Sequence, residues 1–119
     1  MTTTTVAPPA STKKYPSRPE RRAKLEADLE TLFYKSVKGL LRGKPMKIAP
    51  LEAGAPDRMA ILPGGQIHLI ELKTETGTVS PIQKLWHERA RRLGVNVHVI
   101  RGEEELLNWV AARQKDRIS

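Results

Sequence analysis

The sequence predicts a single α/β domain in which a mixed sheet is flanked by helices. The chain has 119 residues, a length that favours one domain. Apolar residues recur with helical spacing in some segments and alternate as in strands in others, and turn residues separate the two kinds of segment. The expected order is helix, about three strands, helix, strand and a C-terminal helix, all within residues 18–119.

The first helix is expected over residues 18–41. Ser17 and Glu20 have the spacing of a capping box, in which each side chain bonds the backbone amide of the other. Apolar residues then recur at helical intervals from Leu25 to Leu40, and Gly39 and Gly43 bracket the expected end. This pattern predicts an amphipathic helix of about six turns.

The residues before this helix form a basic leader. Residues 1–17 are rich in Thr, Pro, Ala and Lys and lack apolar periodicity, so we expect them to be disordered. The net charge of the whole chain is +8, which favours a polyanionic partner such as nucleic acid. The first 24 residues carry six basic groups and one acid, and residues 25–119 carry fifteen basic groups and twelve acids. The leader therefore fits a solubilising tail and a nucleic-acid contact arm equally well.

Three strands are expected after the first helix. Residues 47–49 are the first candidate, and a turn-rich segment follows over residues 50–57. Residues 58–62 and 66–73 then read as strands, with a Pro-Gly-Gly turn at positions 63–65 between them. These two strands should form an antiparallel hairpin, which returns the chain alongside itself.

The second half of the chain predicts a helix, a strand and a last helix. Ser80 and Gln83 form a second capping-box pattern, and Gly94 ends that helix. Residues 95–100 alternate as a strand, and residues 103–113 form a helix with acids in its first turn. The residues expected along the inner side of the middle helix are Ile82, Leu85, Trp86, Arg89, Ala90 and Leu93.

Composition excludes several classes of protein and of site. The chain has no cysteine, which excludes disulfides and thiolate metal sites and fits a reducing cytoplasm. No apolar run approaches the roughly 20 residues that span a bilayer, and the N-terminus lacks the parts of a signal peptide. His68, His87 and His98 lack the spacing of a metal-ligand cluster, so we expect no zinc site. His68 should be packed or at the surface, and His87 should lie on the charged side of its helix.

Three charged residues carry the chemistry that the sequence predicts. Glu71 and Lys73 lie two apart on a strand, so they project from one face. The earlier residues on that face, Ile67 and Leu69, are apolar. The hairpin brings Asp57 close to Glu71, and two neighbouring carboxylates recruit a cation. Oxygen ligands suit Mg²⁺ or Mn²⁺, and the backbone carbonyl of Leu72 is a further candidate ligand.

Lys73 would then position the attacking water or stabilise charge on a phosphate, in metal-assisted phosphodiester hydrolysis. Taken singly, each residue has a plainer explanation. Glu71 and Lys73 could form a solvated pair on an edge strand. Asp57 could be a turn residue after proline. The combination of the three favours a site.

These residues also belong to a recognisable motif. It consists of Ala55-Pro56-Asp57-Arg58, Gly65, Ile70-Glu71-Leu72-Lys73 and Gln83. The motif resembles the PD-(D/E)XK nuclease superfamily and, more closely, its stand-alone, virus-type VRR-NUC domains, over about residues 24–101. The resemblance implies a restriction-endonuclease-like αβββαβ core and an Mg²⁺- or Mn²⁺-dependent nuclease, with no organic cofactor. It implies Asp57 and Glu71 as metal ligands and Lys73 as the catalytic lysine.

The resemblance implies two further site residues. Gln83 should lie near the active centre, although its capping-box position also offers a purely structural role. An acid on the first helix should take part as well; Glu26 is the match, and Glu30, one turn further on, is the reserve candidate. The last helix and the leader lie outside the resemblance.

Stand-alone members resemble Holliday-junction resolvases in forming dimers that cut branched DNA. The resemblance therefore implies a homodimeric, structure-selective DNA endonuclease in the cytoplasm of a bacterium or of a virus-infected host cell. Two other hypotheses are a non-catalytic, basic DNA-binding or assembly protein on a nuclease-like fold, and an enzyme that acts on RNA. The candidate phosphate contacts, for which a solvated surface is the alternative, are Arg58, Arg89, Arg91 and Arg92.

Overall fold

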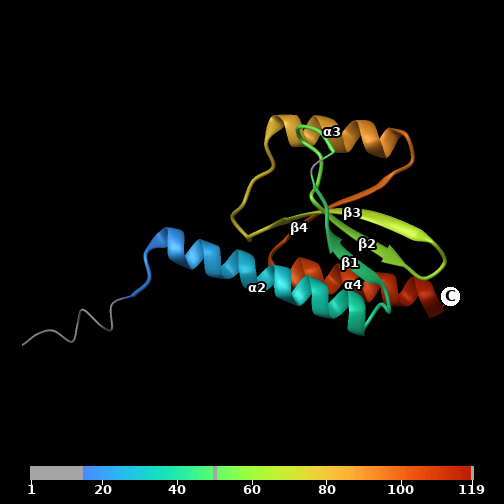
Figure 1. Cartoon of the computed structure of the whole chain (residues 1–119), viewed down its shortest axis with the longest axis horizontal. Coiled ribbons are helices and arrows are strands. Elements are labelled where there is room, and N and C mark those ends of the chain that lie inside the picture. Colours follow the sequence, from blue (N-terminus) through green and yellow to red (C-terminus); the bar gives the residue numbers. More distant parts are fainter. Residues whose placement is uncertain (1–14, 50, 119) are drawn as a thin grey trace, which may run out of the picture.

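The computed structural model describes residues 15–49 and 51–118, so most of the expected leader and Pro50 lie outside the described part. Figure 1 shows three helices and a small sheet, in the order that the sequence predicts. The elements are α2 (Arg18–Gly39), β1 (Lys44–Lys47), β2 (Arg58–Leu62), β3 (Gln66–Lys73), α3 (Pro81–Arg92), β4 (Asn96–Arg101) and α4 (Gly102–Ile118).

The four strands form one mixed sheet in the order β1-β2-β3-β4. The β1–β2 and β2–β3 pairs are antiparallel, and β3 and β4 are parallel. A parallel pair needs a crossover connection, which α3 supplies. Helix α3 lies on one side of the sheet, and α2 and α4 lie together on the other (Figure 1). The predicted α/β class with a mixed sheet is confirmed.

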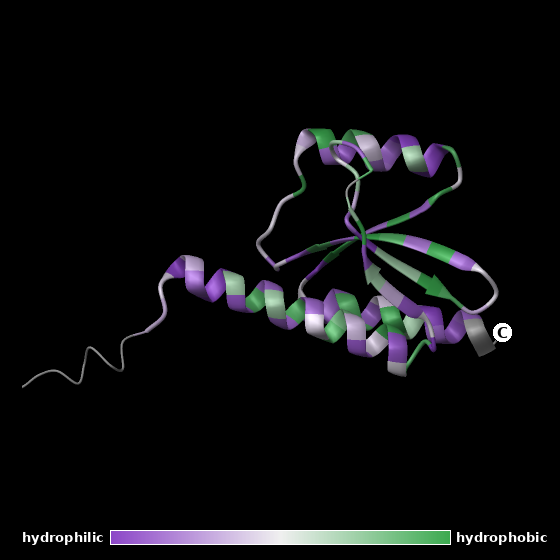
Figure 2. Ribbon diagram, in the orientation of Figure 1, coloured by the Kyte–Doolittle hydropathy of each residue, from purple (hydrophilic) through white to green (hydrophobic). Residues whose placement is uncertain are grey.

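Apolar side chains fill both interfaces between the helices and the sheet. The larger cluster joins α2 and α4 to the sheet and includes Phe33, Ile70 and Leu106, all fully buried. The smaller cluster, which includes Leu69 and Ala90, lies beneath α3. Figure 2 shows apolar residues on the strands and along the middle of α2. Because Leu69 and Ile70 are consecutive in β3, they face opposite sides of the sheet, as strand geometry requires.

Side-chain caps fix where α2 and α3 begin. The Ser17 hydroxyl accepts a bond from the Glu20 amide at 3.2 Å. At α3, the Gln83 amide donates to the Ser80 hydroxyl at 3.3 Å, and the Ser80 amide donates to the Gln83 side chain at 2.9 Å. These bonds satisfy amides that the first helical turn leaves without partners. Among the described helices, none combines the length and the apolar character needed to cross a membrane.

The first strand and the last helix differ from the prediction. Strand β1 is Lys44–Lys47 rather than residues 47–49. Its lysines and Pro45 give it no apolar alternation, but both residue types are tolerated on an edge strand, where one side needs no partner. Helix α4 continues to Ile118 instead of ending at residue 113, because neither Gly nor Pro follows to stop it.

Helix α3 turns a different face towards the sheet from the one predicted. The prediction that His87 lies on the charged side is wrong, since the side chain is 2% exposed. Ile82, Leu85 and Leu93, expected inside, are 51%, 46% and 85% exposed. Apolar residues occur on two sides of this helix, and the side that packs against the sheet is the one that contains His87 and Ala90.

Candidate active site

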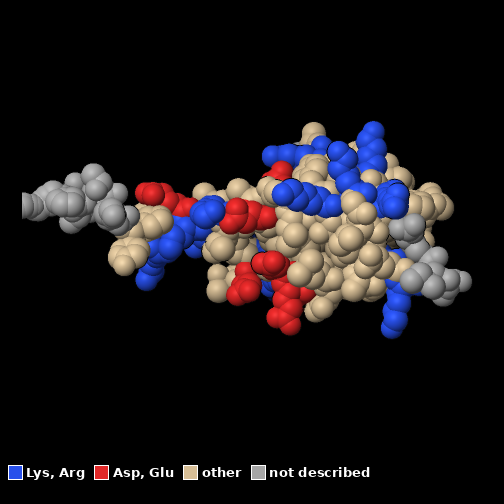
Figure 3. All heavy atoms as spheres, turned by 90° about the horizontal axis from the view of Figure 1, so that it is seen from below, with Lys and Arg blue, Asp and Glu red and all other residues tan. Residues whose placement is uncertain are grey.

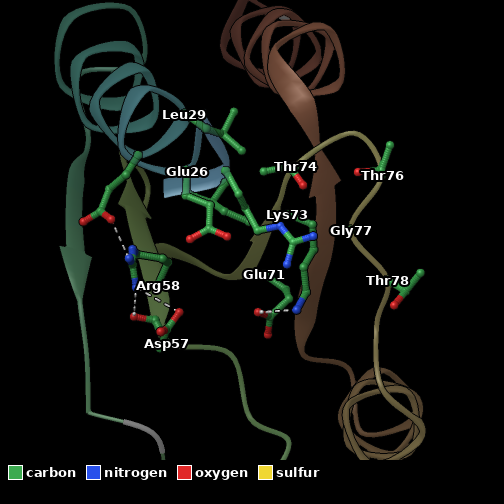
Figure 4. Close-up of a pocket in the computed structure, with 13 residues that line it drawn as sticks. Glu26, Leu29, Asp57, Arg58, Glu71, Lys73, Thr74, Thr76, Gly77 and Thr78 are labelled. Atoms are coloured by element: carbon green, nitrogen blue, oxygen red, sulfur yellow. Dashed lines mark hydrogen bonds and ion pairs between the residues drawn. The ribbon is translucent and has the colours of Figure 1, made fainter. Parts of the chain in front are cut away.

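A polar pocket of about 460 Å³ opens at the end of the sheet. Helix α2, the start of β2, the end of β3 and the loop after β3 line it. Figure 4 shows the carboxylates of Glu26, Asp57 and Glu71 turned towards this space, with the Lys73 ammonium beside Glu71. Three acids and a lysine from separate parts of the chain therefore meet in one pocket.

The hairpin register brings Asp57 and Glu71 together. Arg58 lies opposite Ile70, so the residues that extend this register by one position are Asp57 and Glu71. The Ile48 amide donates to the Asp57 carbonyl at 2.9 Å, which ties the segment before β2 to the end of β1. The meeting of the two acids thus follows from the antiparallel pairing of β2 with β3.

Glu71 is a buried carboxyl whose charge is only partly offset. Its residue is 8% exposed, and one oxygen lies 3.8 Å from the Lys73 ammonium. Burial raises the pKa of Glu71 and the nearby Asp57 adds to this, while Lys73 and Arg58 pull the pKa down. A cation bound beside Glu71 would stabilise its ionised form.

Arg58 holds two of the surrounding acids in place. Its guanidinium lies 2.9 Å from an Asp57 oxygen and 2.7 Å from a Glu30 oxygen. The Arg58 side chain is 10% exposed, whereas those of Glu30 and Asp57 are 38% and 42% exposed, so water reaches both carboxylates. The geometry separates the two helix acids: Glu30 is engaged by Arg58, whereas Glu26 faces the pocket and has no ion-pair partner among the described residues.

The donors at this pocket fit a hard divalent ion. Asp57 and Glu71 offer carboxylate oxygens, and Leu72 also lines the pocket, beyond the end of the β2 register. Among the described residues, no three His, Cys, Asp or Glu side chains lie close enough to bind one ion. Mg²⁺ needs fewer, since it is commonly held by one or two carboxylates together with water and substrate phosphate.

Buried His87 lies next to Glu71, although it is not among the described residues that line the pocket. Its Nε2 atom has no hydrogen-bond partner and lies 4.0 Å from a Glu71 oxygen. Burial lowers the pKa of His87, and the charges of Arg91 and Lys73 lower it further. A neutral imidazole beside Glu71 is compatible with a cation at this carboxylate, because it adds no positive charge.

Comparisons with known proteins identify the fold. One solved structure, described as a VRR_NUC domain, is similar to this chain with a TM-score of 0.64 and 31% sequence identity. The similarity covers 72% of this chain and 94% of that domain. The chain belongs to the VRR-NUC family. The resemblance seen in the motif is thereby confirmed, although no family sequence model and no curated protein matches the chain.

In this VRR-NUC chain, Gln83 serves as a helix cap. Its side-chain oxygen accepts the Ser80 amide at 2.9 Å. Gln83 is not among the described residues that line the pocket. The structural alternative for Gln83 is therefore realised, and a role at the active centre stays a prediction.

The arginines predicted to contact phosphate differ in their surroundings. Arg58 is engaged with Asp57 and Glu30, and Arg91 donates to the Val97 carbonyl at 3.2 and 3.1 Å. The side chains of Arg89 and Arg92 are exposed on α3, away from the residues that line the pocket. None of the four is shown to contact nucleic acid, so this role stays a prediction.

Sequence reasoning missed Arg22 in the pocket of this VRR-NUC chain, and it missed His87 beside Glu71. Arg22 lines the pocket and has no ion-pair partner among the described residues. It precedes Glu26 by four residues, and this helical spacing could have placed both on one face. His87 follows Gln83 by four residues, which is the corresponding signal on α3.

Proposed function

We propose that this protein is a metal-dependent endonuclease that hydrolyses phosphodiester bonds in DNA. Membership in the VRR-NUC family supports the class, a PD-(D/E)XK-type nuclease. The observation that carries the proposal is the meeting of Asp57 and Glu71 beside Lys73 in one polar pocket. A pocket that served only to stabilise the fold would gain nothing from a buried carboxyl whose pKa is raised.

The proposed cofactor is Mg²⁺ or Mn²⁺. The side chains of Asp57 and Glu71 and the carbonyl of Leu72 would hold the ion, and Glu26 is the further candidate from α2. When bound, the ion polarises the phosphate and lowers the pKa of a water molecule. All of these ligand atoms are oxygens, which Mg²⁺ and Mn²⁺ prefer.

The chain's own residues have distinct roles in this proposal. Lys73, whose side chain is 23% exposed, can donate hydrogen bonds to the attacking water or to a phosphate oxygen. Arg58 orients Asp57 through the 2.9 Å ion pair. Arg22 supplies an unpaired cation for a phosphate at the pocket's rim. Gln83 caps the start of α3 and so helps to position this helix, which carries His87.

We also propose that the substrate is branched DNA and that the protein acts as a homodimer. Two duplex arms are hard to grip on one compact domain, and two copies would present two pockets. A row of exposed apolar side chains on and beside α3 supports a second copy there, because such patches mark interaction surfaces. The row consists of Leu51, Ile82, Leu85 and Leu93.

The test is a cutting assay on a labelled four-way junction, a flap and a plain duplex, with Mg²⁺ or Mn²⁺. Wild type should cut at least one of them, and Lys73→Ala should lose nearly all activity. Lys84→Ala, which removes an exposed lysine from α3, is the matched control and should cut normally. If wild type cuts none of these DNAs above the Lys73→Ala level, the proposal is wrong. Matching RNA substrates in the same assay decide between DNA and RNA.

One observation favours a second function, that of a DNA-binding protein without catalysis. Asp57 is already neutralised by Arg58 at 2.9 Å, so the fold does not need a metal there. Calorimetric titration with Mn²⁺ separates the two functions. A nuclease should give a binding heat that Asp57→Asn removes, whereas a pure DNA-binding protein should give no such heat.

A further inference from the structure

One stretch of the chain is basic and free of acids. Residues 31–51 contain five basic residues and no Asp or Glu. All five side chains are exposed, on the second half of α2, in the turn after it and on β1. Figure 3 shows Lys and Arg side chains gathered at the upper right and acidic ones at the lower centre. We call these five residues the basic edge: Lys35, Lys38, Arg42, Lys44 and Lys47.

The basic edge leads to the candidate active site. Strand β1 is an edge strand, and Lys47 at its end lies opposite Arg58. The next residue, Ile48, donates its amide to the Asp57 carbonyl at 2.9 Å. From Lys44 to Lys47 the strand spans roughly 10 Å. Because three residue steps separate Lys44 from Lys47, their side chains leave the strand on opposite faces and flank its open edge.

Ion pairing distinguishes this edge from other basic residues of the protein. None of the five has an ion-pair partner among the described residues, in contrast to Lys24, which pairs with Asp28, and to Arg58. Lysines on an edge strand also discourage strand pairing, and that is the plainer explanation for Lys44 and Lys47. It does not account for Lys35, Lys38 and Arg42, which lie outside the strand. Repulsion among five unpaired cations would be relieved by a bound polyanion.

We propose that the basic edge binds the sugar-phosphate backbone of a DNA strand whose continuation enters the pocket. The inference rests on the proposed function, because the pocket is what selects DNA among polyanions. The contacts are made by point charges on flexible stems, so they recognise phosphate and carry no base preference. The edge positions the strand, and Asp57, Glu71 and Lys73 act on it.

The test measures binding without cutting. Fluorescence anisotropy with a labelled duplex and junction, in EDTA, gives the dissociation constant over a range of salt concentrations. The variant is Lys38→Gln, Lys44→Gln and Lys47→Gln combined. The matched control removes the same charge from exposed lysines elsewhere on the surface, by Lys24→Gln, Lys84→Gln and Lys115→Gln.

The edge variant should bind at least about tenfold more weakly at low salt, and the slope of log K against log salt should fall by about 2 to 3, near 0.9 for each lost contact. The control should change the slope by less than about 1. An unchanged slope in the edge variant, or an equal loss in the control, overturns the proposal. Far-ultraviolet circular dichroism and melting curves show that both variants fold.

The failure of this inference differs from the failure of the proposed function. If wild type cuts no DNA but the edge variant alone loses the salt dependence, the basic edge is correct and the nuclease proposal is wrong. If wild type cuts DNA but the edge variant binds as wild type does, the reverse holds.

Discussion

At the scale of single residues, the chemistry of the site depends on which of its acids have a close cationic partner. Arg58 bridges Asp57 and Glu30, because its guanidinium has two terminal amino groups and each binds one acid. Lysine has one ammonium and lacks this geometry. Among the described residues, the Lys or Arg that pairs with Glu71 is the more distant Lys73, at 3.8 Å. Asp57 and Glu30 are therefore firmly paired, whereas the buried Glu71 is not. A cation from solution gains most beside Glu71, because a buried carboxylate without a close partner is unfavourable.

This imbalance predicts that Glu71 lowers the stability of the metal-free protein. Its pKa is raised on folding, so the folded state disfavours the ionised form. The penalty is present in full above the folded pKa and vanishes below the unfolded value, near 4.3. Glu71→Gln should thus melt a few degrees higher than wild type at pH 7.5 in EDTA, an effect on the order of 1 kcal/mol. It should also lose DNA cutting.

Differential scanning calorimetry at pH 7.5 and at pH 4 checks this prediction. The gain should shrink at the lower pH, where the carboxyl is mostly protonated in both states. Glu88→Gln, on an exposed part of α3, is the control and should shift the melting temperature little at either pH. A Glu71→Gln protein that melts below wild type at pH 7.5 would show that the ionised carboxylate stabilises the fold.

At the scale of elements, the hairpin was predictable and the faces of the flanking helices were not. Strands β2 and β3 match residues 58–62 and 66–73, because a tight Gly-Gly turn fixes the pairing locally. The meeting of Asp57 and Glu71 follows from this pairing. The inward side of α3 depends on the surface that the sheet offers, and the sequence pattern alone did not distinguish its two apolar sides.

Two other features of the elements depend on distant contacts. Strand β1 is defined by its pairing with β2 rather than by apolar alternation, so a window of sequence could not locate it. Arg22 reaches the pocket because α2 crosses the end of the sheet, a relation between elements far apart in the chain. What was predictable is local, and what was missed is set by packing.

The contact between β3, β4 and α4 predicts a loss of stability in acid. His68 and His98 share a hydrogen bond of 2.8 Å, and both pack against the Trp109 ring. Burial lowers the pKa of both imidazoles, and that of His98 falls to about 4. A lowered folded pKa means that the neutral form is preferred in the fold. The contribution of the neutral His98 imidazole to the free energy of unfolding is therefore complete above pH 6.5 and declines as the pH falls towards 4.

Urea unfolding of wild type and of His98→Asn between pH 7.5 and 4 tests this prediction. The free energy of unfolding of wild type should fall more steeply below pH 6.5 than that of the variant, which has one titrating imidazole fewer. Carboxylates contribute equally to both curves, so the difference between them reports the histidine. Parallel curves would mean that His98 does not contribute to the acid sensitivity.

At the scale of the whole molecule, the surfaces proposed for DNA and for a second copy are separate. The basic edge follows α2 and β1, and the exposed apolar row lies at α3, on the other side of the sheet (Figure 1). The pocket lies at the end of the sheet, and none of the described residues that line it belongs to α3. A dimer formed through α3 would therefore leave both basic edges and both pockets open to DNA.

This arrangement predicts a dimer that two substitutions at α3 can separate. Leu85 and Leu93 are 46% and 85% exposed beside a groove of about 760 Å³, and an isologous pair of such faces would bury them. Sedimentation velocity at about 10 µM, a concentration above the dissociation constant of a stable dimer, should show a dimer for wild type. Leu85→Glu with Leu93→Glu should sediment as a folded monomer. Leu107→Glu, which places the same charge on α4 at a residue 43% exposed, should remain dimeric.

A wild type that stays monomeric, or a double variant that stays dimeric, would rule out this interface. Junction cutting by the monomeric variant would further show that one pocket is sufficient.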